Sequence, residues 1–172
     1  MGSGATTTVH CGTAPTQSET DKAREWRKSF FLDSSDAAIE AAAKNPAPDY
    51  DRYGSVRLTT AELAELDRTQ DNVEATRSLR QIVHDHPAEY GQPWVDNEHG
   101  GIFVIQIAPG GSEQPVRDLM AQNNIDPKLV RFETVEHSQA ELSAQQDAFW
   151  RDEVPKLRQR GLVVQSGGAG NK

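Results

Sequence analysis

Cysteine and long apolar runs are the two features that this sequence most conspicuously lacks. The 172 residues include a single cysteine, Cys11, so the chain cannot form an intrachain disulfide. No apolar run approaches the roughly 18 residues that a membrane-spanning helix needs, and the start of the chain has no apolar signal core. The sequence therefore predicts neither a disulfide framework nor a transmembrane segment.

Apolar and basic residues are also scarce. Hydrophobic residues make up 35% of the chain and the mean hydropathy is −0.70, so we expect part of the chain to be solvated or loosely ordered. The chain has 26 acidic and 18 basic residues, a net charge of −8, and no Lys/Arg stripe that would displace counterions from a phosphate backbone. We therefore predict no nucleic-acid partner and attribute the acidity to a soluble surface.

The first half of the chain has helical patterning. Residues 1–20 are rich in Thr, Ser, Gly and Pro and predict a flexible leader. Three helix starts follow: one near Asp21, one capped by Ser35, and one at Thr59, whose spacing to Glu62 fits a capping box. Apolar residues at helical spacing continue the third helix until His86-Pro87 ends it. We predict a helical N-terminal segment over residues 21–90.

After Tyr90 the apolar period changes to that of strands. Trp94 alternates with polar neighbours, and residues 102–107 form a β-branched run typical of a buried strand, with Gly100-Gly101 as the hairpin turn. The pattern then predicts a helix, a third strand, a long helix and a fourth strand, which are centred on Val116–Met120, Leu129–Val135, Ser138–Leu157 (kinked or divided by Pro155) and Leu162–Val164.

This element order predicts an α+β fold. The succession β-β-α-β-α-β favours helices on one face of a mixed four-stranded sheet, as in a ferredoxin-like sandwich. We place the sandwich at residues 91–166, with the helical N-terminal segment packed on it and a flexible tail at residues 167–172.

The sequence has no recognisable catalytic or metal-binding pattern. No segment reads Gly-x-Ser-x-Gly, the motif of a nucleophile elbow. His84 and His86 diverge on a helix because they are two residues apart, and no further ligand follows at a convincing spacing. We therefore predict a protein that is not an enzyme and that holds no cofactor and no metal.

Aromatic side chains are the best candidates for contact with a partner. Trp94, Phe103, Phe132 and Phe149 lie on predicted strands and on one long helix, where a shared core is the expected location for most of them. Trp150 points to another side of its helix than Phe149 does, and Trp26 has Phe30 four residues later. Trp150 and Trp26 are therefore the predicted partner-binding aromatics.

Four short motifs between residues 24 and 172 occur in a combination that suggests a relationship. They are Tyr53-Gly54-Ser55-Val56-Arg57-Leu58-Thr59-Thr60-Ala61-Glu62-Leu63, Trp94-Val95-Asp96 with Gly100-Gly101, Ser138-Gln139-Ala140-Glu141-Leu142, and Gly161-Leu162-Val163-Val164-Gln165-Ser166. Together they resemble the N-terminal regions of secreted bacterial trypsin-like proteins, in particular the pro-region of the α-lytic protease class of chymotrypsin-fold serine proteases.

The resemblance implies a folding assistant and inhibitor without activity of its own. Such a pro-region packs a sheet edge and its C-terminal tail against the protease, which would make Gly167, Gly168 and Gly170 partner contacts. It also implies an extracytoplasmic protein whose partner is a chymotrypsin-fold protease. In that family a further strand and the protease follow the position of Lys172, so the chain is either part of a longer protein or a domain that has lost its protease.

A different function remains open at the other end of the chain. Cys11-Gly12, followed by Thr13, Pro15 and further small polar residues, resembles the tether after the acylated cysteine of a lipoprotein. The ten residues before Cys11 are too short and polar for the signal that lipidation needs, so a free thiol is the competing interpretation. The alternative function is a stand-alone bacterial envelope or lipoprotein domain with a ligand-binding or sensor role.

Overall fold

The protein is an α+β chain of two compact units, Met1–Thr69 and Gln70–Lys172. The structure, a computed structural model, describes residues 16–54 and 56–164. The division falls within helix α3 (Thr60–Ala75), so the helix that follows belongs to the same unit as the sheet. None of the helices in the described residues is both long enough and apolar enough to cross a membrane.

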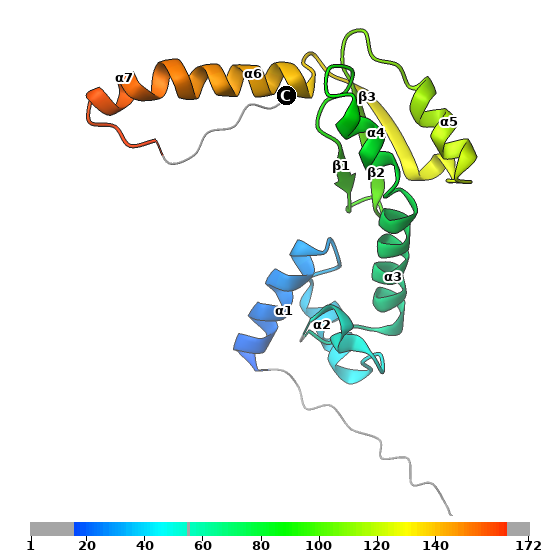
Figure 1. The fold of residues 1–172 in the computed structure, drawn as a ribbon. Coiled ribbons are helices and arrows are strands. Elements are labelled where there is room, and N and C mark those ends of the chain that lie inside the picture. Colours follow the sequence, from blue (N-terminus) through cyan, green and yellow to red (C-terminus); the bar gives the residue numbers. More distant parts are fainter. Residues whose placement is uncertain (1–15, 55, 165–172) are drawn as a thin grey trace, which may run out of the picture. The chain divides into compact units, whose positions relative to one another are not determined.

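The first unit is helical, as predicted. It contains α1 (Gln17–Ser29), α2 (Asp36–Lys44), the 3-10 helix η1 (Tyr50–Tyr53) and the start of α3 (Figure 1). The predicted caps are confirmed: the Ser35 hydroxyl accepts from the Ala38 amide at 3.2 Å, and Thr59 and Glu62 form a reciprocal capping box.

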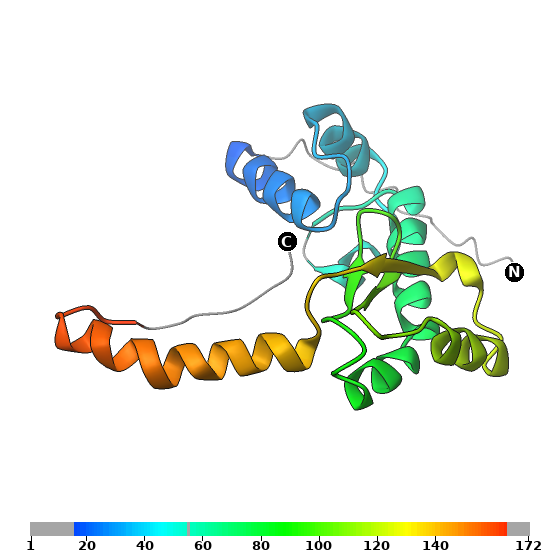
Figure 2. The same ribbon diagram turned by 90° about the horizontal axis from the view of Figure 1, so that it is seen from above.

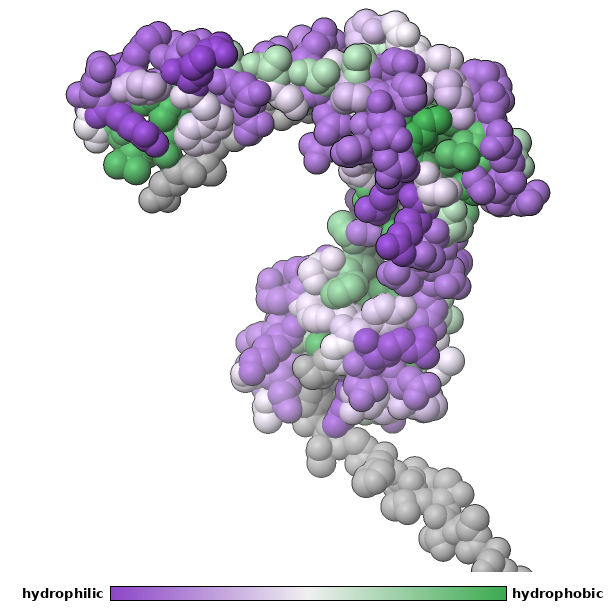
Figure 3. Space-filling view, in the orientation of Figure 1, coloured by the Kyte–Doolittle hydropathy of each residue, from purple (hydrophilic) through white to green (hydrophobic). Residues whose placement is uncertain are grey.

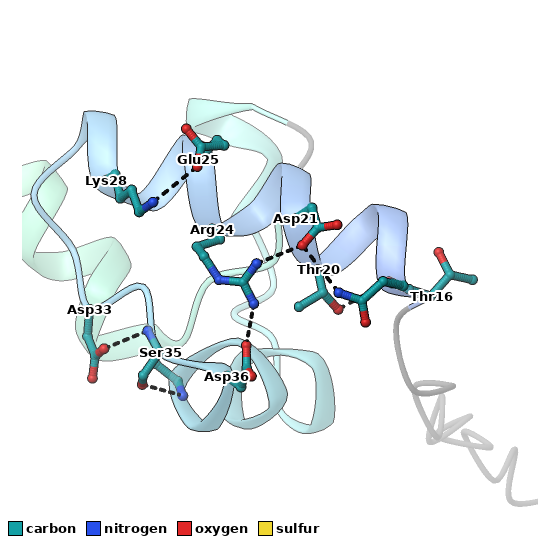
Figure 4. Close-up of polar contacts among 11 residues, drawn as sticks. Thr16, Thr20, Asp21, Arg24, Glu25, Lys28, Asp33, Ser35 and Asp36 are labelled. Carbon is teal, nitrogen blue, oxygen red and sulfur yellow. Dashed lines mark hydrogen bonds and ion pairs between the residues drawn. The ribbon is translucent and has the colours of Figure 1, made fainter.

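The first helix begins earlier than the predicted start at Asp21. The Thr16 hydroxyl accepts from the Glu19 amide at 3.3 Å, and the Glu19 carboxylate accepts from the Thr16 amide at 2.8 Å. This capping box fixes the first turn of α1 within the segment that the sequence predicted as leader. Arg24 then joins α1 to α2, because its guanidinium lies between Asp21 at 2.7 Å and Asp36 at 2.5 Å (Figure 4).

The second unit contains a three-stranded mixed sheet. Strand β1 (Trp94–Asp96) pairs antiparallel with β2 (Ile102–Ile107), and β2 pairs parallel with β3 (Val130–Thr134), in the order β1-β2-β3. The predicted glycine turn is confirmed, since Gly100 and Gly101 have φ of 80° and 82° and close the β1–β2 hairpin.

Two helices cover one face of the sheet. Helices α4 (Leu79–Asp85) and α5 (Gln114–Gln122) lie side by side against it (Figures 1 and 2). Their apolar residues meet alternate residues of β2 in a core formed by Leu79, Val83, Tyr90, Phe103, Ile105, Val116, Met120 and Ile125. The apolar residues that recur at helical spacing and those that recur at strand spacing therefore pack into one core.

A break separates α3 from α4, where the sequence predicted continuous helix. The Thr76 side chain is buried and donates to the carbonyls of Asn72 and Val73 at 3.1 and 3.2 Å. Such a hydroxyl competes with the helical backbone hydrogen bonds. The chain turns at residues 76–78 and starts again as α4.

The last helical segment, named here the C-terminal arm, follows β3. It consists of α6 (Gln139–Ala148), the π-helical turn η3 (Phe149–Glu153) and α7 (Val154–Gln159), and the predicted Ser138–Glu141 capping box opens it. Pro155 lacks the N–H that an α-helix needs at that position, and the wider η3 turn ends two residues before it. The structure therefore has a change of helix type next to Pro155, within a continuous run of helical residues from 139 to 159.

The predicted fourth strand is wrong. After α7 the chain reverses at Gly161, whose φ is 79°, and the Leu162 amide bonds the Leu157 carbonyl at 3.0 Å. Residues 162–164 are not in a strand, and the exposed fractions of Leu162 and Val163 are 51% and 82%. Figure 3 shows the corresponding hydrophobic area at the end of the arm. The sheet has three strands in the described chain, so the four-stranded ferredoxin-like arrangement is not confirmed.

Candidate partner-binding groove at the β1 edge

Strand β1 presents unpaired backbone groups at an edge of the sheet. The Asp96 carbonyl accepts from the Gly101 amide at 2.9 Å, which directs the backbone groups of Asp96 toward β2. Because these directions alternate along an antiparallel strand, the N–H and C=O of Val95 point to the open side. Within the part of the chain that the structure describes, no backbone hydrogen bond takes up these two groups. This is the arrangement that accepts an added strand.

The preceding part of the same edge is already covered. The Gln139 amide at the start of α6 donates to the Tyr90 carbonyl at 2.8 Å, and the Ala140 amide donates to the Pro87 carbonyl at the same distance. Pro93 has no N–H of its own to offer. The open stretch is therefore β1 itself, directly after the segment that α6 covers.

A groove with a volume of 560 Å³ lies beside this open stretch. It is lined by residues of α4, β1, β2 and the start of α6, namely Arg80, Gln81, His84, Gln92, Pro93, Trp94, Val95, Phe103 and Gln139. The volume is within the range of peptide side-chain and small-molecule sites. The groove and the open strand edge together form what we call the β1 site.

The groove of the β1 site has one arginine and no acidic residue in its lining, in a chain of net charge −8. Arg80 and His84 lie one turn apart on the same side of α4, and none of the lining residues is an Asp or Glu. The guanidinium carbon of Arg80 lies 5.7 Å from the centre of the Phe103 ring, a cation–π contact that holds it at the groove.

On the opposite face of the sheet, an acidic side chain fixes the surroundings of Trp94. Asp96 is 5% exposed, and its carboxylate lies 2.9 Å from both Nδ1 of His99 and a guanidinium nitrogen of Arg131. The hydrogen bond from His99, followed by that from Arg131, lowers the pKa of Asp96. Arg131 in turn lies 5.7 Å from the Trp94 ring centre, so these residues position an aromatic side chain that is 43% exposed.

Asp96 and His99 form a hydrogen-bonded pair within the hairpin. Asp96 and His99 have the orienter–base relationship of a catalytic pair, but no described serine, threonine or cysteine hydrogen-bonds to His99. Asp96 instead closes the hairpin by accepting from the His99 amide at 3.2 Å. In residues 16–54 and 56–164, no group of His, Cys, Asp or Glu is arranged to hold a metal ion.

The structure places the predicted partner-binding aromatics outside the β1 site. Trp26 is half-buried in the first unit, where it packs against that unit's core and stacks on Phe30 at 4.2 Å. Trp150 is half-buried on the C-terminal arm and meets Phe149 edge-on at 6.0 Å. Four further predicted positions, Cys11, Gly167, Gly168 and Gly170, lie outside the described residues.

Local sequence patterns did not predict the residues that form the β1 site. The sequence pattern groups Trp94 with the core aromatics, yet Trp94 is 43% exposed, whereas Phe103 is 1% exposed. The spacing of Arg80 and His84 on α4 was the one local signal that these two side chains share a face of the helix.

Comparison with known proteins identifies no relative of this chain. No family model, no curated protein and no solved structure matches it.

Proposed function

We propose that this chain is a non-catalytic protein-binding domain that acts as the pro-region of a secreted chymotrypsin-fold serine protease does. It binds its partner by adding a partner strand to β1. The observation that supports this function is the open edge at Val95 beside the 560 Å³ groove. Strand addition obtains affinity from backbone hydrogen bonds and specificity from pockets for alternate side chains, and the β1 site offers both.

The proposed complex has a larger sheet. A partner strand beside β1 brings the three strands to four, the number that the ferredoxin-like prediction requires. The side chains of an added strand alternate between the α4 face, where the groove lies, and the face that bears Trp94. Residues 162–164, which are mostly exposed at the end of the arm, supply a second contact in this proposal. The proposed location is extracytoplasmic, where such proteases act.

The test combines inhibition with refolding of a bacterial chymotrypsin-fold protease. The purified chain is expected to inhibit the protease at nanomolar concentration or to raise its refolding yield. Val95→Pro removes the outward N–H of β1 without removing a bond to β2, so this variant is expected to lose the effect.

A matched control blocks the opposite edge of the sheet. The Val135 amide bonds the Ile107 carbonyl at 3.0 Å, so the Thr134 N–H points away from β2, and Thr134→Pro removes only that outward group. Thr134→Pro is expected to keep full activity. Equal loss in both variants, with both shown to be folded, would exclude β1 as the specific edge. Absence of any effect on several such proteases would reject the pro-region function and favour the stand-alone envelope domain.

A further inference from the structure

Arg80 has no carboxylate partner among the described residues, a feature that it shares with Arg57, Arg158 and Arg160. Most of the others form ion pairs: Arg24, Arg27, Arg52, Arg68, Arg77, Arg117, Arg131 and Arg151. Arg77, one turn before Arg80, contacts Glu74 at 3.1 Å. Among the described residues, Arg80 has only its contact with the Phe103 ring. Its charge is therefore available at the groove.

The acid nearest in sequence is already engaged by other side chains. Asp85 accepts from the side-chain amide of Gln81 at 2.7 Å and lies 3.5 Å from Nδ1 of His84. Neither Asp85 nor any other acid lines the groove. The Arg80 guanidinium is therefore not opposed by a carboxylate in the groove lining, and it attracts a negatively charged group more strongly than a neutral one.

We infer that the segment that binds at β1 carries an Asp or Glu whose carboxylate Arg80 receives. This inference rests on the proposed strand addition and adds the chemistry of the bound segment. A guanidinium presents paired N–H donors that match the two oxygens of a carboxylate, and the Phe103 ring restrains the Arg80 side chain in advance. His84, one turn later on α4, also lines the groove.

The strand period specifies where the acid lies in the bound segment. Side chains two residues apart on an added strand lie on the same face. The face toward α4 meets Val95, which packs against the apolar core, and Arg80 at the rim of the groove. The bound segment is an extended peptide with an acidic residue two positions from an apolar residue.

The test uses two blocked peptides and the full chain. The probe is acetyl-Thr-Val-Thr-Glu-Thr-Val-Thr-amide, in which the glutamate is the only charge, and its match has Gln in place of Glu. Amide chemical shifts of the protein are followed during titration. We expect both peptides to shift the signals of Trp94, Val95 and Asp96, and the Glu peptide to bind about fivefold more tightly.

Two variants identify Arg80 as the receiving group. Arg80→Gln is expected to make the two peptides bind equally, whereas Arg77→Gln, which breaks an ion pair outside the groove, is expected to keep the fivefold difference. Equal binding of the two peptides to the unmodified chain at β1 would overturn the carboxylate inference and leave strand addition intact. No shift at Val95 with either peptide would overturn both.

Discussion

Arg27 of α1 and Glu62 of α3 form a buried ion pair in the first unit. The Arg27 side chain is fully buried, and besides its closer contact with Glu62 its second guanidinium nitrogen lies 3.1 Å from the other carboxylate oxygen. The guanidinium also donates to the carbonyls of Asp33 at 2.9 Å and Arg57 at 3.2 Å. The same carboxylate caps α3 through Thr59, so one side chain both neutralises the buried charge and starts a helix.

Removal of the Glu62 charge is expected to destabilise the first unit strongly. Glu62→Gln leaves the Arg27 charge buried without its counterion, and breaking such a pair costs about 3 kcal/mol in the free energy of unfolding. Urea unfolding monitored by Trp26 fluorescence, with Trp94 and Trp150 replaced by Phe, reports on this unit alone. Glu65→Gln is the control, because its pair with Arg68 is exposed and is worth less than about 1 kcal/mol. Similar losses in both variants would contradict the prediction.

The same pair makes the stability of the first unit depend on pH. Burial by itself raises the pKa of Glu62, but hydrogen bonds from Arg27 and Thr59 outweigh it, so the pKa lies below its ordinary value of 4.5. The unfolded chain therefore binds more protons in acid, and this contribution is complete above pH 4.5 and is lost as the pH falls through the lower native pKa. The Trp26-monitored urea midpoint should fall in that range, and less steeply in Glu62→Gln. Identical slopes would show that other groups cause the acid sensitivity.

The sequence predicted the features that depend on neighbouring residues. The Thr59–Glu62 and Ser138–Glu141 capping boxes and the glycine hairpin are local patterns, and the structure contains all three. The strand predicted at residues 162–164 failed because β-branched composition shows only that a segment suits a strand. It does not show that a sheet edge lies beside it.

The β1 site could not be predicted from local patterns, because it is formed by residues that are distant in sequence. Its lining comes from α4, β1, β2 and α6, and Arg80 and Gln139 are brought together only by the fold. The exposure of Trp94 likewise follows from the edge position of β1, which the alternation of the sequence does not specify.

Phe31 occupies a backbone conformation that favours glycine, so Phe31→Gly is expected to stabilise the first unit. Its φ is 58°, directly after α1, and the Leu32 amide bonds back to the Arg27 carbonyl at 3.0 Å in a helix-ending turn. The side chain is 55% exposed, so relief of the left-handed conformation outweighs the lost contacts by about 0.5 kcal/mol. Phe30→Gly is the control: Phe30 has φ of −108° and stacks on Trp26, so its loss should lower the urea midpoint. A lower midpoint in Phe31→Gly would indicate that the exposed ring contributes more than the strain.

Asp96 contacts both the hairpin turn and the surroundings of Trp94, so Asp96→Asn is expected to lower the stability of the hairpin and the affinity of the β1 site. The substitution removes the charge that Arg131 and His99 contact at 2.9 Å, and loss of these charge-assisted bonds at a 5% exposed side chain costs about 2 kcal/mol. Arg131 then loses the contact that holds it over the Trp94 ring. The emission maximum of Trp94 should therefore shift, measured in a background in which Trp26 and Trp150 are replaced by Phe. Glu133→Gln removes the other partner of Arg131, at 3.1 Å on the more exposed side, and should cost less than about 1 kcal/mol and leave Trp94 in place. Binding of a peptide at β1 should weaken in Asp96→Asn and not in Glu133→Gln, because Trp94 is the first residue of the strand that receives the partner. Equal binding by the two variants would show that Trp94 does not contact the bound peptide.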